Sequence, residues 1–328
     1  MKKLLTLVLT ATMLLSVMLF AVSCDKGGSD NGEGYKFGII AQMENGAFLD
    51  MKEGIISRLE EKGYTEENTE IVYKCAQGDA TALSTICNSM DDGSYDAIFT
   101  IATPATQAFV NLESDTPCFF CAVSAPVAAG VITEMESPDK NATGTSNAIP
   151  TEEIIKLADM LTSGIDKFGF IYCTAQVNAT NTVNSACAYL DSLNIDYTVK
   201  TVENSDEVAS VTEALINDGA KAIFVPNDSV VQSGITALAE ICEEEKIPTY
   251  CSSATTVESG CLATLAIDDK GIGEKTADMA IAYLEGKAIE DIPAVVVGID
   301  YCTVNKALAE KLGVEIPEDM GYEVKMFE

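Results

Sequence analysis

Lys36-Phe37-Gly38-Ile39-Ile40 is followed later in the chain by a close copy, Lys167-Phe168-Gly169-Phe170-Ile171. A second pair of copies, Asp96-Ala97-Ile98-Phe99 and Lys221-Ala222-Ile223-Phe224, has nearly the same separation. Each copy is a short apolar run of the kind that favours a buried β-strand. Two pairs of copies in the same order indicate that two similar halves follow each other along the chain.

Strand-like runs alternate with helical patterns through both halves. The runs that predict strands are 36–41, 70–74, 97–102, 118–123, 167–173, 197–202, 222–226, 248–251, 262–267 and 294–299. The patterns that predict helices are 48–61, 152–162, 182–193, 208–217, 230–245, 272–284 and 304–311. This alternation is typical of parallel sheets with helices on both faces.

The fold class expected from this pattern is α/β, with two Rossmann-like lobes built on parallel sheets and joined by a hinge of three crossovers. We expect lobe 1 at 35–147 plus 268–291 and lobe 2 at 148–267 plus 292–328. The crossovers are then near 147–151, 266–269 and 291–294. Open α/β sheets bind ligands beyond the carboxyl ends of their strands, so the expected small-molecule site is the cleft between the lobes.

The extreme N-terminus has the pattern of an export signal. A lysine pair, Lys2-Lys3, precedes the almost entirely apolar run 4–22, and small residues lead directly to Cys24. The pattern resembles a bacterial lipoprotein signal peptide at 1–23, with Cys24 becoming the acylated first residue. The alternative is an uncleaved transmembrane anchor, because the run is nearly long enough to cross a bilayer. Both place the body outside the cytoplasm, behind a flexible tether at 24–34.

Charge and cysteine content argue against several functions. A net charge of -31 disfavours nucleic acid and anionic lipid headgroups as partners of the body. The chain has 11 cysteines and no histidine, which leaves ten cysteines after Cys24. Four of these, Cys118, Cys121, Cys173 and Cys251, lie in apolar strand-like runs, which predicts buried thiols. We therefore expect neither a metal site nor a cofactor.

Five short segments occur in a fixed order along the chain. They are ATPATQA at 102–108, AVSAPV at 122–127, NATGTS at 141–146, VPNDS at 225–229 and LATLAID at 262–268. Together they resemble the ABC-transporter substrate-binding family typified by tryptophan- and tyrosine-binding proteins, over Tyr35 to about Pro317. The resemblance implies a type I periplasmic-binding-protein fold, delivery to a permease and an ATPase, and in characterised members an aromatic amino acid as ligand.

One end of an amino-acid ligand is a carboxylate, which helix N-termini and hydroxyl groups can hold. Thr and Pro favour the start of a helix, so a helix is expected to begin at Thr103-Pro104. The candidate ligand residues in this half are Thr103, Pro104, Ala105, Thr106 and Ser124. For Thr103 the alternative is that it caps its helix and has no ligand role.

The ligand's ammonium group needs an acidic partner, and Asp228 is the candidate. It follows the predicted strand 222–226, and the alternative is that it caps the next helix. The resemblance supports Asp228, which matches the acidic position of the family's Pro-Thr-Asp segment, and its neighbour Asn227. It also adds Asn178, which matches an Asn of the family's Asn-Ser pair, and Gln176, where the family commonly has Glu.

Aromatic and basic residues bear on the identity of the ligand. Phe48 or Phe109 can stack on an aromatic ligand, although both also fit core positions of a helix. Ala125 replaces an Asp that is usual in the family, and Gly46-Ala47 replaces a His-Pro. Arg58, the only arginine, is expected to be solvated. Without an Arg fork the cleft is poorly suited to phosphates or dicarboxylates, so a zwitterionic or neutral ligand fits better.

The sequence lacks the residues that common enzyme sites need. It has no G-x-x-x-x-G-K-[ST] loop, no G-x-S-x-G motif and no His for a Ser-His or Cys-His pair. We interpret the chain as a monomeric, non-enzymatic solute-binding subunit at the outer face of the cytoplasmic membrane, attached only through a lipid on Cys24. Its lobes would close on the ligand. The alternatives are the same clamp for a nucleoside or another solute, or a ligand-sensing lipoprotein with a signalling partner.

Overall fold

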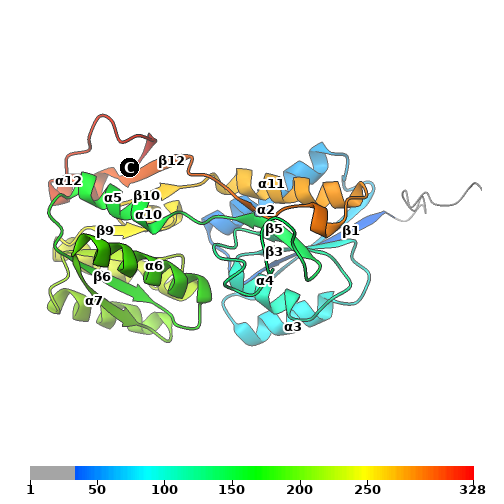
Figure 1. The fold of residues 1–328 in the computed structure, drawn as a ribbon, viewed down its shortest axis with the longest axis horizontal. Coiled ribbons are helices and arrows are strands. Elements are labelled where there is room, and N and C mark those ends of the chain that lie inside the picture. Colours follow the sequence, from blue (N-terminus) through cyan, green and yellow to red (C-terminus); the bar gives the residue numbers. More distant parts are fainter. Residues whose placement is uncertain (1–33) are drawn as a thin grey trace, which may run out of the picture.

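The computed structural model describes residues 34–328 as two α/β lobes that lie side by side, each with its own sheet (Figure 1). The predicted signal peptide, Cys24 and the tether as far as residue 33 lie outside the described residues. Within 34–328, no helix has the length and apolar character needed to cross a membrane. The expected α/β class with two lobes is confirmed.

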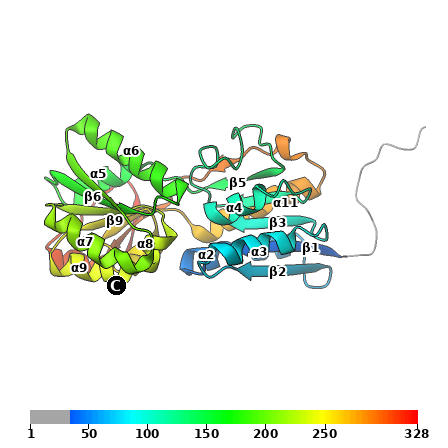
Figure 2. The same cartoon turned by 90° about the horizontal axis from the view of Figure 1, so that it is seen from below.

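Lobe 1 is built on a six-stranded parallel sheet with the order β11-β5-β4-β3-β1-β2. Its strands are β1 (Tyr35–Ala41), β2 (Thr69–Cys75), β3 (Ala97–Ile101), β4 (Cys118–Cys121), β5 (Ala142–Ser146) and β11 (Val295–Val296). Its helices are α2 (Gly46–Glu61), α3 (Ala80–Met90), α4 (Thr103–Val110), α11 (Asp269–Leu284) and the short 3₁₀ helix η2 (Ile289–Asp291). Helices α2 and α11 cover one face of the sheet and α3 and α4 the other, with an apolar core beneath each pair (Figures 1 and 2).

Lobe 2 is built on a seven-stranded sheet with the order β13-β12-β10-β9-β8-β6-β7, in which only the β10–β12 pair is antiparallel. Its strands are β6 (Lys167–Tyr172), β7 (Asp196–Thr201), β8 (Ala222–Val225), β9 (Thr249–Cys251), β10 (Ala263–Ala266), β12 (Tyr301–Asn305) and β13 (Glu323–Phe327). Its helices are α5 (Thr151–Leu161), α6 (Val177–Leu193), α7 (Val208–Asn217), α8 (Ser229–Ser233), α9 (Ile235–Glu244), α10 (Ala254–Glu258), α12 (Lys306–Leu312) and the 3₁₀ helix η1 (Ser205–Glu207).

The sequence repeats correspond to equivalent strands of the two sheets. The run that begins at Lys36 forms β1, which lies between β2 and β3, and the run that begins at Lys167 forms β6, which lies between β7 and β8. The second pair of copies forms β3 and β8. The prediction of two similar halves is therefore confirmed by the strand order.

Helices α6 and α11 begin five and three residues earlier than predicted, and two other predicted helices differ in a more informative way. The pattern at 230–245 is interrupted at Gly234 and forms α8 and α9, because the chain there packs against η1: an added Cβ at Gly234 would lie 2.8 Å from the backbone oxygen of Ser205. The pattern at 304–311 begins too early, since Val304 and Asn305 belong to β12. The Asn305 side chain caps α12 by accepting a hydrogen bond from the Leu308 N–H at 2.9 Å.

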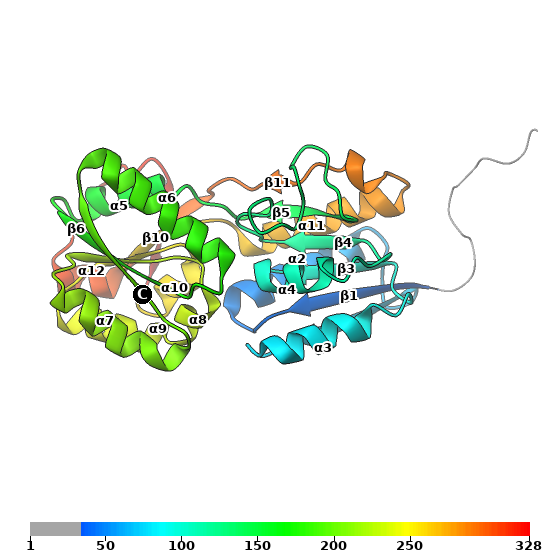
Figure 3. The same cartoon turned by 60° about the horizontal axis from the view of Figure 1, so that its bottom comes forward.

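Three connections join the lobes, and they lie close together on one side of the molecule (Figures 1 and 3). The first leads from β5 to α5 and the second from β10 to α11. The third lies a few residues later than the position 291–294 expected from sequence. Val295 and Val296 pair with β5 in lobe 1, and the Asp300 N–H is the first to bond to lobe 2, at Ala266 O (2.9 Å). Residues 292–296 therefore pack with lobe 1.

Helices α2 and α11 cross in close contact. A Cβ at Gly54 would lie 2.1 Å from Lys270 O, and one at Gly273 would lie 2.2 Å from Met51 O. Arg58, expected to be solvated, joins the same two helices: its Nε and Nη2 donate to the two carboxylate oxygens of Asp278 at 2.7 and 3.1 Å. The crossing fixes the N-termini of both helices at the edge of the lobe that faces lobe 2.

The ten cysteines of the described part of the chain are free thiols, and most of them are buried. Cys118 and Cys121 face opposite sides of β4 and belong to different apolar cores, as their spacing along a strand requires. Cys173 and Cys251 are also buried in the core of lobe 2. Within residues 34–328 no group of His, Cys, Asp or Glu residues has the arrangement of a metal site.

Candidate ligand-binding cleft

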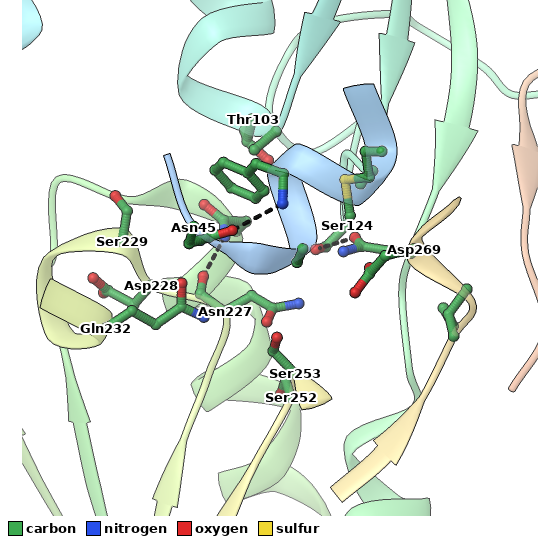
Figure 4. A pocket seen from close by; sticks show the side chains of 18 of the residues that line it. Asn45, Thr103, Ser124, Asn227, Asp228, Ser229, Gln232, Ser252, Ser253 and Asp269 are labelled. Atoms are coloured by element: carbon green, nitrogen blue, oxygen red, sulfur yellow. Dashed lines mark hydrogen bonds between the residues drawn. The ribbon is translucent and has the colours of Figure 1, made fainter. Parts of the chain in front are cut away.

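A pocket lies between the lobes at the carboxyl ends of the central strands of both sheets (Figure 4). The volume of the pocket, including the part that is open to solvent, is about 740 Å³. Lobe 1 contributes the start of α2, the segments after β3 and β4, and the start of α11. Lobe 2 contributes the segments after β6, β8 and β9. The predicted ligand residues that line the pocket are Phe48, Thr103, Pro104, Ser124, Gln176, Asn178, Asn227 and Asp228.

The other two predicted residues, Ala105 and Thr106, lie in the core beneath the pocket and are fully buried. The Thr106 hydroxyl donates to Ala102 O at 2.9 Å and contacts the Thr100 hydroxyl at 2.9 Å. Their positions in the first turn of α4 turn them toward the sheet, so neither reaches the cleft.

Helix α4 begins at the pocket without a capping side chain. Ala102, rather than Thr103, occupies the N-cap position, and no side chain accepts from the first-turn N–H groups. Thr103 is instead the first helical residue and lines the pocket. Ala102 has φ 69° and ψ 165°, and Ala122, at the end of β4, has φ 60°. Non-glycine residues rarely adopt these conformations, and both of these residues line the pocket.

Ser124 is hydrogen-bonded to the first inter-lobe connection. Its hydroxyl donates to Asn147 Oδ1 at 2.8 Å, and its backbone oxygen accepts from the Ser146 hydroxyl at 3.2 Å. Asn147 also lines the pocket. The Ser124 side chain at the cleft is thus held in place by Asn147 of the first inter-lobe connection.

Asp228 is fully buried and caps α8. Its Oδ1 accepts from the N–H groups of Val230 and Val231 at 2.9 and 3.1 Å, and its Oδ2 accepts from the Cys173 N–H at 2.6 Å. Burial raises the pKa of this carboxyl, and the three backbone N–H groups oppose the increase. The capping role that the sequence left open is therefore present through Oδ1, and the bond to Cys173 occupies Oδ2.

Gln176 and Asn178 connect the loop after β6 to the loop after β8. Gln176 Nε2 donates to the Ser229 hydroxyl at 2.6 Å, and Asn178 Nδ2 donates to Asn227 O at 2.5 Å. Because Asn227 O only accepts, the Asn178 amide is oriented with its Oδ1 away from this bond. That Oδ1 is buried and has no hydrogen-bond partner among the described residues.

Of the two phenylalanines considered for ligand contact, Phe48 lines the pocket, whereas Phe109 is buried in the lobe 1 core. Asn45 caps α2 by accepting from the Phe48 N–H at 2.9 Å, and this bond fixes the backbone at Phe48. Met51 and Ile267 add apolar surface to the pocket. An apolar area therefore adjoins the polar residues of the cleft.

Several lining residues are not among those that the sequence predicts. They include Asn45, Gln232, Ser252, Ser253 and Asp269. The signal for the last three was available, because each comes directly after a predicted strand, where ligand-facing side chains are expected. Asn45 and Gln232 do not directly follow a predicted strand, so the sequence gives no comparable indication that they face the ligand.

The electrostatic character of the pocket is acidic. Among residues 34–328, Asp228 and Asp269 are the only charged residues that line it, and no Lys or Arg does. Burial, followed by the nearby carboxylates of Asp50, Asp268 and Glu258, raises the pKa of Asp269 to about 7. A pocket with two carboxyl groups and no basic side chain favours a ligand that carries a positive charge.

Residues 36–325 match the family model described as ABC transporter substrate binding protein. The chain belongs to this family. Its members are extracytoplasmic solute-binding proteins rather than enzymes, so the expected family and the absence of an enzymatic role are confirmed.

Relatives of this substrate-binding protein cover nearly all of its length. A tyrosine-binding protein from Clostridioides difficile is 30% identical over 323 residues, which are 96% of this chain and 93% of the relative. The structure of an ABC domain from Streptococcus pneumoniae in complex with L-Trp is 26% identical, with a TM-score of 0.85 over 90% of this chain and 99% of that one. The ligand-free, open structure of a substrate-binding protein with adhesive properties from Clostridium difficile is 29% identical, with a TM-score of 0.71 over 90% and 100% of the two chains.

More distant structures share the fold alone. A 5-methylthioribose transporter solute-binding protein from Thermotoga lettingae is 13% identical, with a TM-score of 0.59 over 80% of this chain and 84% of that chain. The type I periplasmic-binding-protein fold expected from the resemblance is thereby confirmed.

Proposed function

We propose that this substrate-binding protein holds a zwitterionic small molecule, an aromatic amino acid such as Trp, Tyr or Phe, in the inter-lobe cleft and delivers it to an ABC permease and its ATPase. The observation that carries the proposal is the chemistry of one pocket. It combines an uncapped helix N-terminus with carboxyl groups and contains no basic side chain. The printed descriptions of two relatives, a tyrosine-binding protein and an L-Trp complex, support the ligand class.

The ligand's carboxylate is assigned to the start of α4. The free first-turn N–H groups of this helix carry partial positive charge, and an anion near them is stabilised. The Thr103 hydroxyl lines the pocket and can donate to a carboxylate oxygen, whereas the Ser124 hydroxyl already donates to Asn147 Oδ1. Binding by main-chain N–H groups explains how a pocket without Arg or Lys accommodates a negatively charged group.

The ligand's side chain is assigned to the apolar area around Phe48. An aromatic ring can pack edge-on or offset against the Phe48 ring, with Met51 and Ile267 completing the contact. Phe48 is the one aromatic residue among those that line the pocket. We therefore expect the preference for an aromatic ligand to depend strongly on this side chain.

The lobe arrangement supports a clamp that closes on its ligand. Gly46, at the start of α2, approaches α10 across the cleft: an added Cβ would lie 3.3 Å from the Thr255 methyl carbon. The TM-score is larger with the L-Trp complex than with the ligand-free, open relative, at similar coverage. Both observations favour a closed arrangement, which a ligand would stabilise by contacting both lobes.

The proposed setting is the outer face of the cytoplasmic membrane. Lipidation of Cys24 would anchor a monomeric protein there, with the residues before Tyr35 as a tether. The permease would recognise the closed, loaded form. An anchored receptor captures the ligand close to the permease that consumes it.

A thermal-shift screen of the purified full-length protein tests the function. The ligands are the twenty amino acids, a set of nucleosides and a set of sugars. A ligand present at one hundred times its Kd stabilises the folded state by about 2.7 kcal/mol, which is readily seen as a higher Tm. We expect the largest shifts with Trp, Tyr or Phe. A shift with a nucleoside or a sugar alone would overturn the amino-acid assignment and leave the clamp intact.

A further inference from the structure

The proposed function leaves open which side chain holds the cationic end of the ligand. Asp228 was expected for this role, but its two oxygens already accept three backbone hydrogen bonds and the residue is fully buried. Asp228 thus has little capacity to bind a further donor. The ammonium partner must be sought among the other acceptors of the pocket.

Asp269 is the second carboxyl group in the pocket and has no partner of its own. It is the first residue of α11 and lines the cleft from lobe 1, on the same side of the pocket as Ser124 (Figure 4). No hydrogen bond or ion pair among residues 34–328 involves its carboxylate, and no cation contributes to its ionisation. The side chain is only partly exposed, and it lines the pocket.

No lysine or arginine of the described chain offsets the charge of Asp269, because the adjacent Lys270 on α11 pairs with Glu53 at 2.8 Å. Asp50 of α2, Asp268 beside it and Glu258 of α10 are the acidic groups that face it. Tyr301 of β12 and Cys121 of β4 also face it: burial raises the pKa of both, and the negative charge of Asp269 adds to the increase. Burial and these carboxylates raise the pKa of Asp269 to about 7, because no cation stabilises its charged form.

A second acceptor in the same pocket also lacks a partner. Asn178 is 7% exposed, and its Oδ1 makes no hydrogen bond within the described part of the chain. Its orientation is fixed by the bond from its Nδ2 to Asn227 O. A buried unpaired oxygen costs free energy unless a donor reaches it, and a ligand N–H group is the donor that the pocket lacks.

We propose that Asp269 binds the cationic group of the ligand, so that an acid of lobe 1, and not Asp228 of lobe 2, sets the requirement for a positive charge. The inference rests on the proposed function and assigns one half of the zwitterion within it. When binding occurs below neutral pH, the proton on the Asp269 carboxyl is released to solvent as the ammonium group pairs with the carboxylate. The affinity therefore falls as the pH decreases below about 7.

The test compares L-tryptophan with its deaminated analogue, 3-indolepropionate, on the full chain by isothermal titration calorimetry at pH 7.5. Removing one partner of a buried charge pair corresponds to a loss of about 100-fold in affinity. We expect Asp269→Asn to bind L-tryptophan about 100-fold more weakly than the wild-type protein does, and its affinity for 3-indolepropionate to change by less than about threefold. Asp50→Asn is the matched control, because Asp50 faces Asp269 but is exposed and does not line the pocket.

The outcomes separate the inference from the function on which it rests. Wild-type protein that binds none of L-tryptophan, L-tyrosine and L-phenylalanine would overturn both. Wild-type protein that binds L-tryptophan while Asp269→Asn binds it equally well would overturn the inference alone. An equal loss in Asp50→Asn would also overturn it, because the effect would then come from the general acidity of the region.

Proton release gives a readout that a merely structural role of Asp269 would not change. Titrations at pH 6.5 in two buffers of different ionisation enthalpy measure the number of protons released on binding. We expect wild-type protein to release a large fraction of one proton and Asp269→Asn to release none. Equal proton release by the two proteins would assign the titrating group elsewhere and overturn the proposal.

Discussion

The Cys173 N–H donates to Asp228 Oδ2 at 2.6 Å and thereby joins the two loops of lobe 2 that face the cleft. The other oxygen of Asp228 caps α8. One buried side chain thus holds the ends of β6 and β8 in register, and the same loops carry Gln176, Asn178 and Asn227 into the pocket. Asp228 shapes the binding surface by its structural bonds.

Replacing Asp228 by Ala is expected to destabilise the ligand-free protein. The change leaves three backbone N–H groups, two of them buried, without an acceptor, which corresponds to a loss of about 2–3 kcal/mol in the free energy of unfolding. Asp79→Ala is the matched control, because Asp79 caps α3 through the Thr81 and Ala82 N–H groups on the exposed surface, and its loss should be about 1 kcal/mol. Urea denaturation measures both. Unchanged stability in Asp228→Ala together with complete loss of ligand binding would contradict the structural role.

Larger side chains at Gly46 are expected to hold the lobes apart. Its Cβ position lies 3.3 Å from the Thr255 methyl carbon across the cleft, and its backbone has no unusual φ. In the series Ala, Val, Leu we expect the affinity for the ligand to fall progressively, by about tenfold at the largest side chain, as the closed state loses about 1.4 kcal/mol. The Tm of the ligand-free protein should stay within a few degrees. Affinity that is independent of side-chain size would show that this contact does not limit closure.

Gly273→Ala is expected to destabilise lobe 1. An added methyl group would lie 2.2 Å from Met51 O, a backbone atom that cannot move without displacing α2. We expect a loss of roughly 2–3 kcal/mol, of the size seen for overpacking. Gly298→Ala is the control, since nothing lies within 4 Å of its Cβ position. Thermal melting distinguishes the two, and equal Tm values would show that the helix crossing tolerates separation.

Asp269→Asn is expected to stabilise the ligand-free protein in a pH-dependent manner. The folded-state pKa of about 7 lies above the ordinary value of 3.8, so ionisation of Asp269 opposes folding. Its destabilising effect grows as the pH rises from about 4 to 7 and stays constant above 7. We expect the variant's advantage to follow the same course and to reach roughly 2 kcal/mol at pH 8, allowing for partial exposure. An advantage that is the same at pH 5 and pH 8 would contradict the raised pKa.

The sequence predicts the parts of this fold that depend on local patterns. The copies at Lys36 and Lys167 gave equivalent strands, because alternating apolar runs and helices leave few ways to build a sheet. The two-residue strand β11 has no comparable pattern, since its place in lobe 1 depends on pairing with β5. The sequence pattern therefore predicts the third connection a few residues too early.

The candidate site could be predicted only as far as strand ends and helix starts allow. Asp228 stood out because it follows a strand, but its bond to the Cys173 N–H depends on where a distant loop lies. Thr106 looked like a ligand residue until the helical turn placed it against the sheet. Asp269 follows the predicted strand 262–267, yet its importance comes from the acidic groups of α2 and α10, which only the folded chain brings together.

The central claim is that the cleft recognises both charges of an amino acid, and calorimetric titration of the full-length protein tests it most directly. The ligands are L-tryptophan, L-tyrosine and L-phenylalanine, with tryptamine and 3-indolepropionate as analogues that each lack one charged group. We predict that at least one of the amino acids binds, and that both analogues bind about 100-fold or more weakly than L-tryptophan, since each leaves a polar group of the cleft unpaired. An affinity for either analogue equal to that for L-tryptophan, or no binding of any aromatic amino acid, would contradict it.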